Sequence, residues 1–361
     1  MKLQRLRKDT LSGYTTFGCM WEKGRCQEET AYICKDREGK IVPIQSRITA
    51  YWPDGSVKWT AHTAQSALLG EEIEVTPGEP ADFRGMSVED DGKKIKINNG
   101  CFCIEITRGS DLLFDSVHTK QGEVASKARA VLQLEEPAQV GGYEARVTKP
   151  YAGVVKEIEL EERGALQCIL KFTGCHRNRD GEERMPFIIR MRINWECSAL
   201  HFTHTFLYDG DEDRDFLKGL GISFETPLSG ALYNRHVKFQ GDHGVFHEAV
   251  VPLMSWRPGI PRKIYEAQMD CERLFPEGEE LATIGKVLQD TPYWSVYDIC
   301  QDSASHFMVR KKLKYDNCCY VDSLHGKRSK GAFAYGSEAG RQNCLQYEAG
   351  GICRCHDAAY R

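Results

Sequence analysis

Arginine, lysine and histidine side chains recur in a few strand-like stretches of this 361-residue sequence, where they could bind a carboxylate and move a proton. Arginine binds a carboxylate through two parallel hydrogen bonds, and histidine changes its charge near neutral pH. Paired arginine and histidine donors therefore suit a ligand such as a uronic acid. The candidate residues are Lys58, His62, Arg190, Arg192, His204, Lys218, Arg235 and His236.

The stretch from Arg190 to Phe224 is the most informative. Strand alternation puts Arg190, Arg192 and Asn194 on one face and apolar side chains on the other, so the polar face is either solvated or a ligand groove. His204 shares its face with Phe202, Phe206 and Tyr208. It is either a hydrogen-bonded core histidine or a sugar-facing group beside a stacking surface.

Three further features carry alternatives of the same kind. Lys218 lies between apolar residues, where burial would lower its pKa or the side chain would reach out to water. The acidic turn from Tyr208 to Asp213 lacks the ligand spacing of an EF-hand and is read as solvated. The segment from Tyr233 to His236, with the donors His243, His247 and Glu248 that follow, is either a polar strand edge or a carboxylate-binding wall.

A hairpin is predicted at YWPDGSVKWT, residues 51–60, where the sequence Pro53-Asp54-Gly55-Ser56 forms the turn. Turn chemistry and tryptophan packing explain this hairpin as a structural element of a small barrel. They do not explain why Lys58 and His62 fall on the same strand face.

Composition excludes several classes of protein. The 48 Lys and Arg against 52 Asp and Glu give a net charge of −4, without the basic field that nucleic acid or an anionic membrane would need. The first residues lack the apolar stretch of a secretory signal, and the 15 cysteines are odd in number and irregularly spaced. We therefore expect reduced thiols and a cytoplasmic protein. No cofactor motif is found, and the cluster Cys353-Arg354-Cys355-His356 lacks a second ligand pair at zinc-finger spacing, so we expect neither cofactor nor metal.

The elements that must position these residues are strands. Apolar residues alternate with period two throughout, and turns such as Asp91-Gly92 and Asn99-Gly100 separate the runs, so the fold class is all-β. The segment VTPGEPADFRG, residues 75–85, reads as a linker between a small closed barrel and a large antiparallel β-sandwich. The predicted borders are a barrel over 1–77, a linker over 78–92, a sandwich over 93–340 and an irregular tail over 341–361.

Five separated motifs in order resemble the exo-rhamnogalacturonan lyase and YetA-like family. They are WEKG at 21–24, VPIQSRITAYWPDGSVKW at 42–59, THTFLYDGDEDRDFLKGLGISF at 203–224, YNRHVKFQGDHGVFHEAV at 233–250 and HGKRSKGAF at 325–333. The resemblance implies an N-terminal RIFT-type barrel, a central β-sandwich and a C-terminal (α/α) toroid. The toroid has no counterpart in this sequence, and a truncated or frameshifted end would explain the irregular tail.

The resemblance also implies an activity. Enzymes of the family cleave a rhamnose–galacturonate linkage by β-elimination, which needs a cation for the carboxylate, a base for the proton at C5 and an acid for the leaving oxygen. The first hypothesis is therefore a lyase-like protein for uronate-containing oligosaccharides of pectin. The second is a non-catalytic carbohydrate-binding or structural β-module. A separate toroid domain or a second copy of the chain is the expected protein partner.

Overall fold

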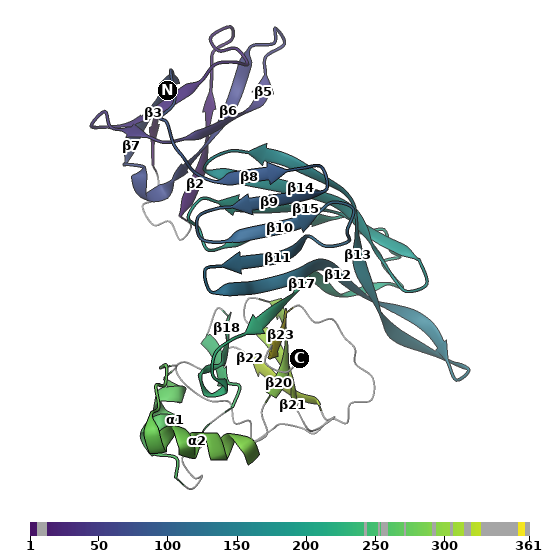
Figure 1. The fold of residues 1–361 in the computed structure, drawn as a ribbon. Coiled ribbons are helices and arrows are strands. Elements are labelled where there is room, and N and C mark those ends of the chain that lie inside the picture. Colours follow the sequence, from purple (N-terminus) through teal and green to yellow (C-terminus); the bar gives the residue numbers. More distant parts are fainter. Residues whose placement is uncertain are drawn as a thin grey trace.

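The computed structural model describes residues 1–5, 13–241, 244–251, 253, 259–270, 272–290, 294–303, 306–313, 319–325 and 353–357. Figure 1 shows a small barrel-like unit at one end, a large sandwich in the middle and a third segment, which contains the helices, at the other end. Strands dominate all but the third segment, and the predicted all-β class is confirmed.

The N-terminal unit consists of two small antiparallel sheets around one core. One sheet has the order β1 (Lys2–Gln4), β7 (Glu72–Pro77), β3 (Tyr32–Asp36) and β4 (Ile41–Val42); the other has β2 (Tyr14–Met20), β6 (Val57–Gln65) and β5 (Gln45–Tyr51). A 3-10 turn, η1 (Ser66–Leu68), follows β6. Alternate side chains of both sheets point inward and form a core that contains Trp21, Tyr32, Val57 and Val75.

The predicted turn closes the hairpin of β5 and β6. Gly55 has a φ of +85°, a conformation that suits glycine, and the Asp54 carboxylate accepts hydrogen bonds from the Ser56 amide and hydroxyl at 3.1 and 2.7 Å. The turn therefore satisfies its own polar groups and needs no ligand to hold its shape.

The sandwich is built from two sheets that share one strand. The smaller sheet has the order β8 (Ser87–Asp90), β9 (Lys94–Asn98), β10 (Cys103–Thr107), β11 (Phe114–Thr119) and β12 (Gly122–Val140). The larger has β16 (Leu200–Phe206), β15 (Glu183–Asn194), β14 (Gln167–Arg177), β13 (Tyr143–Arg163), β12 and β17 (Phe216–Leu228). β12 passes from one sheet to the other at Lys127, which has a φ of +54° and interrupts the pairing register. The core between the sheets includes Ile95, Ile104, Phe172 and Ile189.

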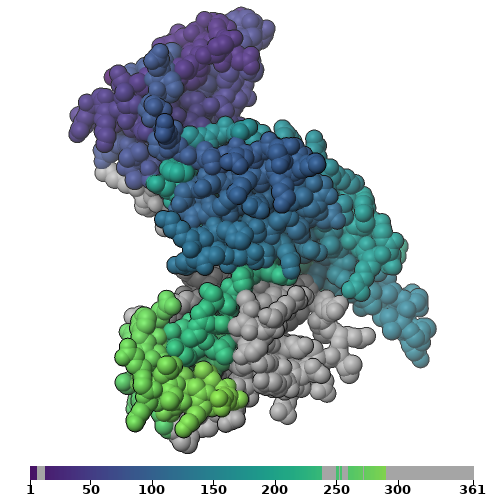
Figure 2. Space-filling view, in the orientation of Figure 1, coloured from purple at the N-terminus to yellow at the C-terminus, as the bar shows by residue number. Residues whose placement is uncertain are grey.

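The far halves of β12 and β13 form a long hairpin that projects from the sandwich (Figure 2). At its tip Tyr143 is 80% exposed.

The predicted alternation in β15 is confirmed, with one exception. Ile189, Met191 and Ile193 are fully buried, and Arg190 and Arg192 lie on the opposite face. Asn194 differs because it is only 2% exposed; its side chain donates a hydrogen bond to the Gln167 side chain at 3.2 Å. The polar face of this strand therefore ends at Arg192.

A side-chain clamp joins the barrel to the sandwich. The Gln45 side-chain oxygen accepts hydrogen bonds from the Leu166 and Gln167 amides at 2.9 Å each, and its NH₂ group donates to Gln167 O at 2.9 Å and to Glu162. A Cβ atom at Gly164 would lie 2.1 Å from this amide, so only glycine leaves room for it. The connection between β7 and β8, residues 78–86, is shorter than the predicted linker because β8 already belongs to the sandwich.

The third segment contains two helices that the sequence analysis did not predict. After η2 (Leu232–Asn234), β18 (His236–Gly241) pairs with β19 (Gly244–Ala249), and α1 (Arg262–Met269) and α2 (Gly278–Asp290) follow. Both helices are short, and each packs a narrow stripe, centred on Ile264 and Ile284, against a small core. At 8 and 13 residues the two helices give only a few turns in which a helical period can be recognised.

Four more strands extend the large sheet beyond β17. β23 (Cys353–Asp357) lies next to β17, and β20 (Trp294–Ser303), β21 (His306–Leu313) and β22 (Cys319–His325) follow in that order. The segment predicted as an irregular tail, 341–361, thus contributes β23, and the rest of that segment lies outside the described residues.

Candidate functional site

Lys58 and His62 belong to the barrel and do not form a common site. The Lys58 ammonium lies 4.4 Å from the centre of the Trp52 ring, in a cation–π contact. His62 is fully buried and hydrogen-bonded at both ring nitrogens, to Ser46 at 2.8 Å and Thr60 at 2.7 Å. Burial lowers the pKa of His62 to about 4, so the ring is neutral at pH 7.

Arg190, Arg192 and His204 lie on neighbouring strands but face different ways. The Arg190 guanidinium forms two hydrogen bonds with Glu161, at 2.7 and 2.9 Å, and this pairing lowers the pKa of the Glu161 carboxyl. Arg192 is exposed on the same face. His204 instead packs among the rings of His176, Phe187 and Phe206, and burial lowers its pKa to about 4.

Lys218 lies on β17, which pairs with β12. Its ammonium is 3.0 Å from the Glu135 carboxylate, which also accepts a hydrogen bond from Arg146 at 2.9 Å. These two cations lower the pKa of Glu135. Lys218 thus serves a surface ion-pair network on the solvent side of the sheet.

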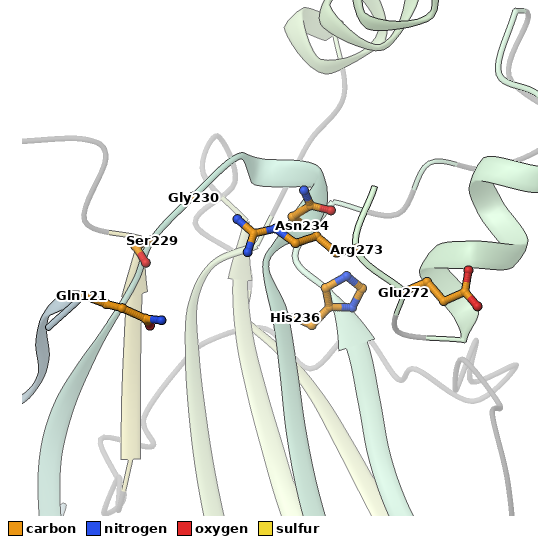
Figure 3. A pocket seen from close by; sticks show the side chains of 7 residues that line it. All are labelled: Gln121, Ser229, Gly230, Asn234, His236, Glu272 and Arg273. Carbon is orange, nitrogen blue, oxygen red and sulfur yellow. The ribbon is translucent and has the colours of Figure 1, made fainter. Parts of the chain in front are cut away.

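Arg235 and His236 lie where β17 leads into β18, at a pocket of 420 Å³. Its lining residues come from the β11–β12 turn, from the connection between β17 and β18, from the first residue of β18 and from the segment after α1: Gln121, Ser229, Gly230, Asn234, His236, Glu272 and Arg273. Figure 3 shows the Arg273 guanidinium extending toward the Ser229 side of the pocket, while the Glu272 carboxylate points away from it. The predicted donors His243, His247 and Glu248 lie outside the described side chains.

Hydrogen bonds fix the walls of this pocket. The Asn234 side chain donates to Leu274 O at 2.9 Å and accepts from Leu274 N at 2.8 Å, which holds the residues on either side of Leu274 in place. The buried Arg235 guanidinium donates to Gly230 O through two nitrogens, at 2.8 and 2.7 Å, and so closes the connection before β18. Arg235 therefore shapes the wall and does not line the pocket.

The α1 helix is tied to the same wall by Gln268, which is fully buried. Its NH₂ group donates to Tyr233 O at 2.8 Å and to Val251 O at 3.1 Å, and its oxygen accepts from the Leu253 amide at 2.7 Å. Every polar atom of this buried side chain is satisfied, so the helix and the wall form one preorganised unit.

The chemistry of the pocket is that of a polar, anion-tolerant site. Arg273 offers a planar set of donors for a carboxylate, His236 can accept or donate a proton, and Gln121 and Asn234 belong to the side-chain types that hydrogen-bond hydroxyl groups. Phe275, which is 78% exposed, lies beside it, with the Arg273 guanidinium carbon 5.8 Å from its ring centre. An exposed aromatic face next to polar donors suits a sugar ring.

The sequence analysis missed Gln121, Glu272 and Arg273. The only local signal in the sequence was the charged pair Glu272-Arg273 close to the aromatic Phe275, and this pattern is too common to mark a site by itself. Within the described part of the chain, no three His, Cys, Asp or Glu side chains gather as metal ligands do. The helices that the structure describes include none long and apolar enough to cross a membrane.

The chain is similar to known proteins over nearly its whole length. The model of the PcRGLX-like protein central β-sandwich domain matches residues 86–343, and that of the PcRGLX-like N-terminal RIFT barrel domain matches residues 1–78. The chain is 28% identical over 337 residues to the uncharacterized protein YetA of Bacillus subtilis (strain 168). The aligned region covers 92% of this chain and 39% of that protein. The predicted order of a RIFT-type barrel and a β-sandwich is confirmed.

Proposed function

Because the chain belongs to the PcRGLX-like family, with its RIFT barrel and central β-sandwich, we propose that it is a carbohydrate-active protein of the rhamnogalacturonan lyase type. Its ligand is an oligosaccharide with a uronate residue, bound in the pocket between the β11–β12 turn and the segment after α1. The observation that carries the proposal is that Arg273 and His236 line one pocket, with the exposed Phe275 ring beside the Arg273 guanidinium.

The reaction is an exo-acting β-elimination next to a galacturonate. A base removes the proton at C5, the bond between C4 and the leaving oxygen breaks, and a C4–C5 double bond forms while the leaving oxygen gains a proton. Arg273 would stabilise the negative charge that builds up on the carboxylate side, and His236 would exchange the proton at C5. Asn234 would position Arg273 through its two hydrogen bonds with Leu274.

The test uses purified protein and rhamnogalacturonan oligosaccharides, with binding followed by calorimetry and elimination by the ultraviolet absorbance of the unsaturated uronide. We expect Arg273→Ala to weaken binding about tenfold or more, because a charge-assisted hydrogen bond contributes roughly 1.5–3 kcal/mol. His236→Ala should abolish the absorbance rise and leave most of the binding. Matched controls are Arg262→Ala on α1, 82% exposed, and His118→Ala on β11, also exposed, neither of which lines the pocket.

A non-catalytic binding module is the second candidate, and one observation favours it. Among the lining residues only His236 and Glu272 are of types that commonly act as a general base or acid, and the Glu272 carboxylate points away from Arg273 (Figure 3). Binding that Arg273→Ala weakens, without any absorbance rise from the parent protein, would identify a binding module. If the oligosaccharide does not bind, the assignment of the pocket is wrong.

The cellular location is also part of the proposal. The eight cysteines whose side chains the structure describes are free thiols, as is usual in the reducing cytoplasm. We therefore place the protein there, acting on oligosaccharides and not on polymer.

A further inference from the structure

Two turns at the barrel-facing end of the sandwich are held together by one side chain. Asn99, in the turn between β9 and β10, is fully buried. Its side-chain oxygen accepts a hydrogen bond from the Cys101 amide at 3.0 Å, and its NH₂ group donates to Cys197 O at 2.8 Å, in the turn between β15 and β16. One amide group and two hydrogen bonds therefore separate the backbones of two cysteines that are 96 positions apart in the sequence.

Further contacts bring the same two turns together. The Glu196 amide donates to Asn99 O at 2.7 Å. A Cβ atom on Gly100 would lie 3.0 Å from the Trp195 ring and 3.4 Å from the Glu196 side chain, so the two turns approach each other closely just before Cys101 and Cys197. The Cα atoms in a disulfide lie about 4.4–6.8 Å apart, a separation that such a close approach allows.

Both thiols can be reached from solvent. Cys101 is exposed and Cys197 is half-buried, whereas five of the six other cysteines with described side chains are buried: Cys19, Cys26, Cys34, Cys168 and Cys175. Tyr14, at the start of β2 in the barrel, lies close to both, since burial together with Glu196, Cys197 and Cys101 raises the pKa of Tyr14 to about 12. The two turns that carry these cysteines thus lie side by side at the junction of barrel and sandwich.

We propose that Cys101 and Cys197 are a redox-sensitive pair that forms a reversible disulfide. A hydroperoxide oxidises one thiolate to the sulfenic acid, and the second thiol attacks that sulfur and releases water. In total the two thiols lose two electrons and two protons, one S–S bond forms, and hydrogen peroxide is reduced to two molecules of water. The bond would connect the turn of the smaller sheet to the turn of the larger sheet, beside the barrel.

The experiment treats the full-length reduced protein with hydrogen peroxide, traps remaining thiols with an alkylating agent and maps the peptides by mass spectrometry. We expect one linked peptide pair, Cys101 with Cys197, a loss of about 2 Da per molecule and complete reversal by a dithiol reductant. Because the bond closes a long loop, the oxidised protein should also melt at a higher temperature than the reduced protein. Neither readout depends on the proposed lyase activity.

The variants Cys101→Ser and Cys197→Ser should each abolish the linked pair and the rise in melting temperature. Cys103→Ser, a half-buried neighbour on β10, is the matched control and should leave both unchanged. The proposal is overturned if Cys101 links to any other cysteine of the chain, if it links between molecules, or if peroxide carries both thiols to sulfinic acid with no disulfide between them.

Discussion

Acidification should destabilise the barrel through His62. The ring is fully buried, and its two nitrogens are hydrogen-bonded to the hydroxyl groups of Ser46 and Thr60. The Trp21 indole in turn donates a hydrogen bond to the Thr60 hydroxyl at 2.8 Å. The Thr60 hydroxyl accepts a hydrogen bond from the indole and can donate one to the unprotonated nitrogen of His62. This chain of hydrogen bonds therefore suits the neutral imidazole. A proton added to the buried ring would have no carboxylate to pair with among these partners.

The size of the effect comes from the two pKa values. Burial lowers the pKa of His62 to about 4 in the folded protein, against 6.5 in the unfolded chain. The unfolded state therefore binds more protons between these values, and the stability conferred by His62 is fully present above pH 6.5 and is lost as pH falls toward 4. Between pH 7.5 and 4.5 the loss amounts to about 2.5 kcal/mol.

The assay is urea unfolding at a series of pH values, followed by tryptophan fluorescence, for the parent protein and for His62→Gln. The glutamine side chain cannot titrate, so the difference between the two pH profiles gives the contribution of His62 to stability, separate from that of the carboxylates and the other histidines. We expect the difference in the free energy of unfolding between the two proteins to change by about 2.5 kcal/mol between pH 7.5 and 4.5. Parallel profiles, or an NMR titration that puts the pKa of His62 near 6.5, would refute the reasoning.

Three other predictions concern the clamp, an excluded candidate and the pocket. Gly164→Ala should destabilise the protein by about 1–3 kcal/mol in urea unfolding, because the new methyl group would displace the Gln45 amide; Gly285→Ala, where a Cβ meets open space, is the control, and equal midpoints would contradict the clamp. Arg190→Ala should cost no more than about 1 kcal/mol and leave oligosaccharide binding intact in calorimetry, since its guanidinium pairs with Glu161 at the surface; lost binding would move the site to β15. Phe275→Ala should weaken binding about tenfold with an unchanged melting temperature, and unchanged affinity would argue against stacking on this ring.

Sequence periodicity predicted the strands well where one face is buried. The alternation of Ile189, Met191 and Ile193 with Arg190 and Arg192 appears in β15 as expected, because each apolar side chain contributes to the core between the sheets. The predicted turns at Gly55 and Gly100 are present with positive φ values. Local patterns of this kind depend only on neighbours in the chain.

The pocket depended on contacts that no local pattern contains. His236 and Arg273 are 37 positions apart, and they share a wall because Asn234 pairs with the backbone of Leu274. Lys58, Arg190 and Lys218 looked available in the sequence, yet a Trp ring, Glu161 and Glu135 hold them, and these partners lie on other turns or strands. The expected partner domain or second copy stays a prediction.

The crossing of β12 from one sheet to the other has a consequence for how the sandwich comes apart. The strand pairs with β11 through one end, with β13 through the other and with β17 between them, and Lys127 marks the change. Neither sheet can lose β12 without exposing the core that both cover, so the two sheets should unfold as a single cooperative unit. Amide protons in the first half of β12, up to Leu134 and before the projecting hairpin, should then exchange with solvent only when the whole sandwich opens, and their exchange rate would report its global stability.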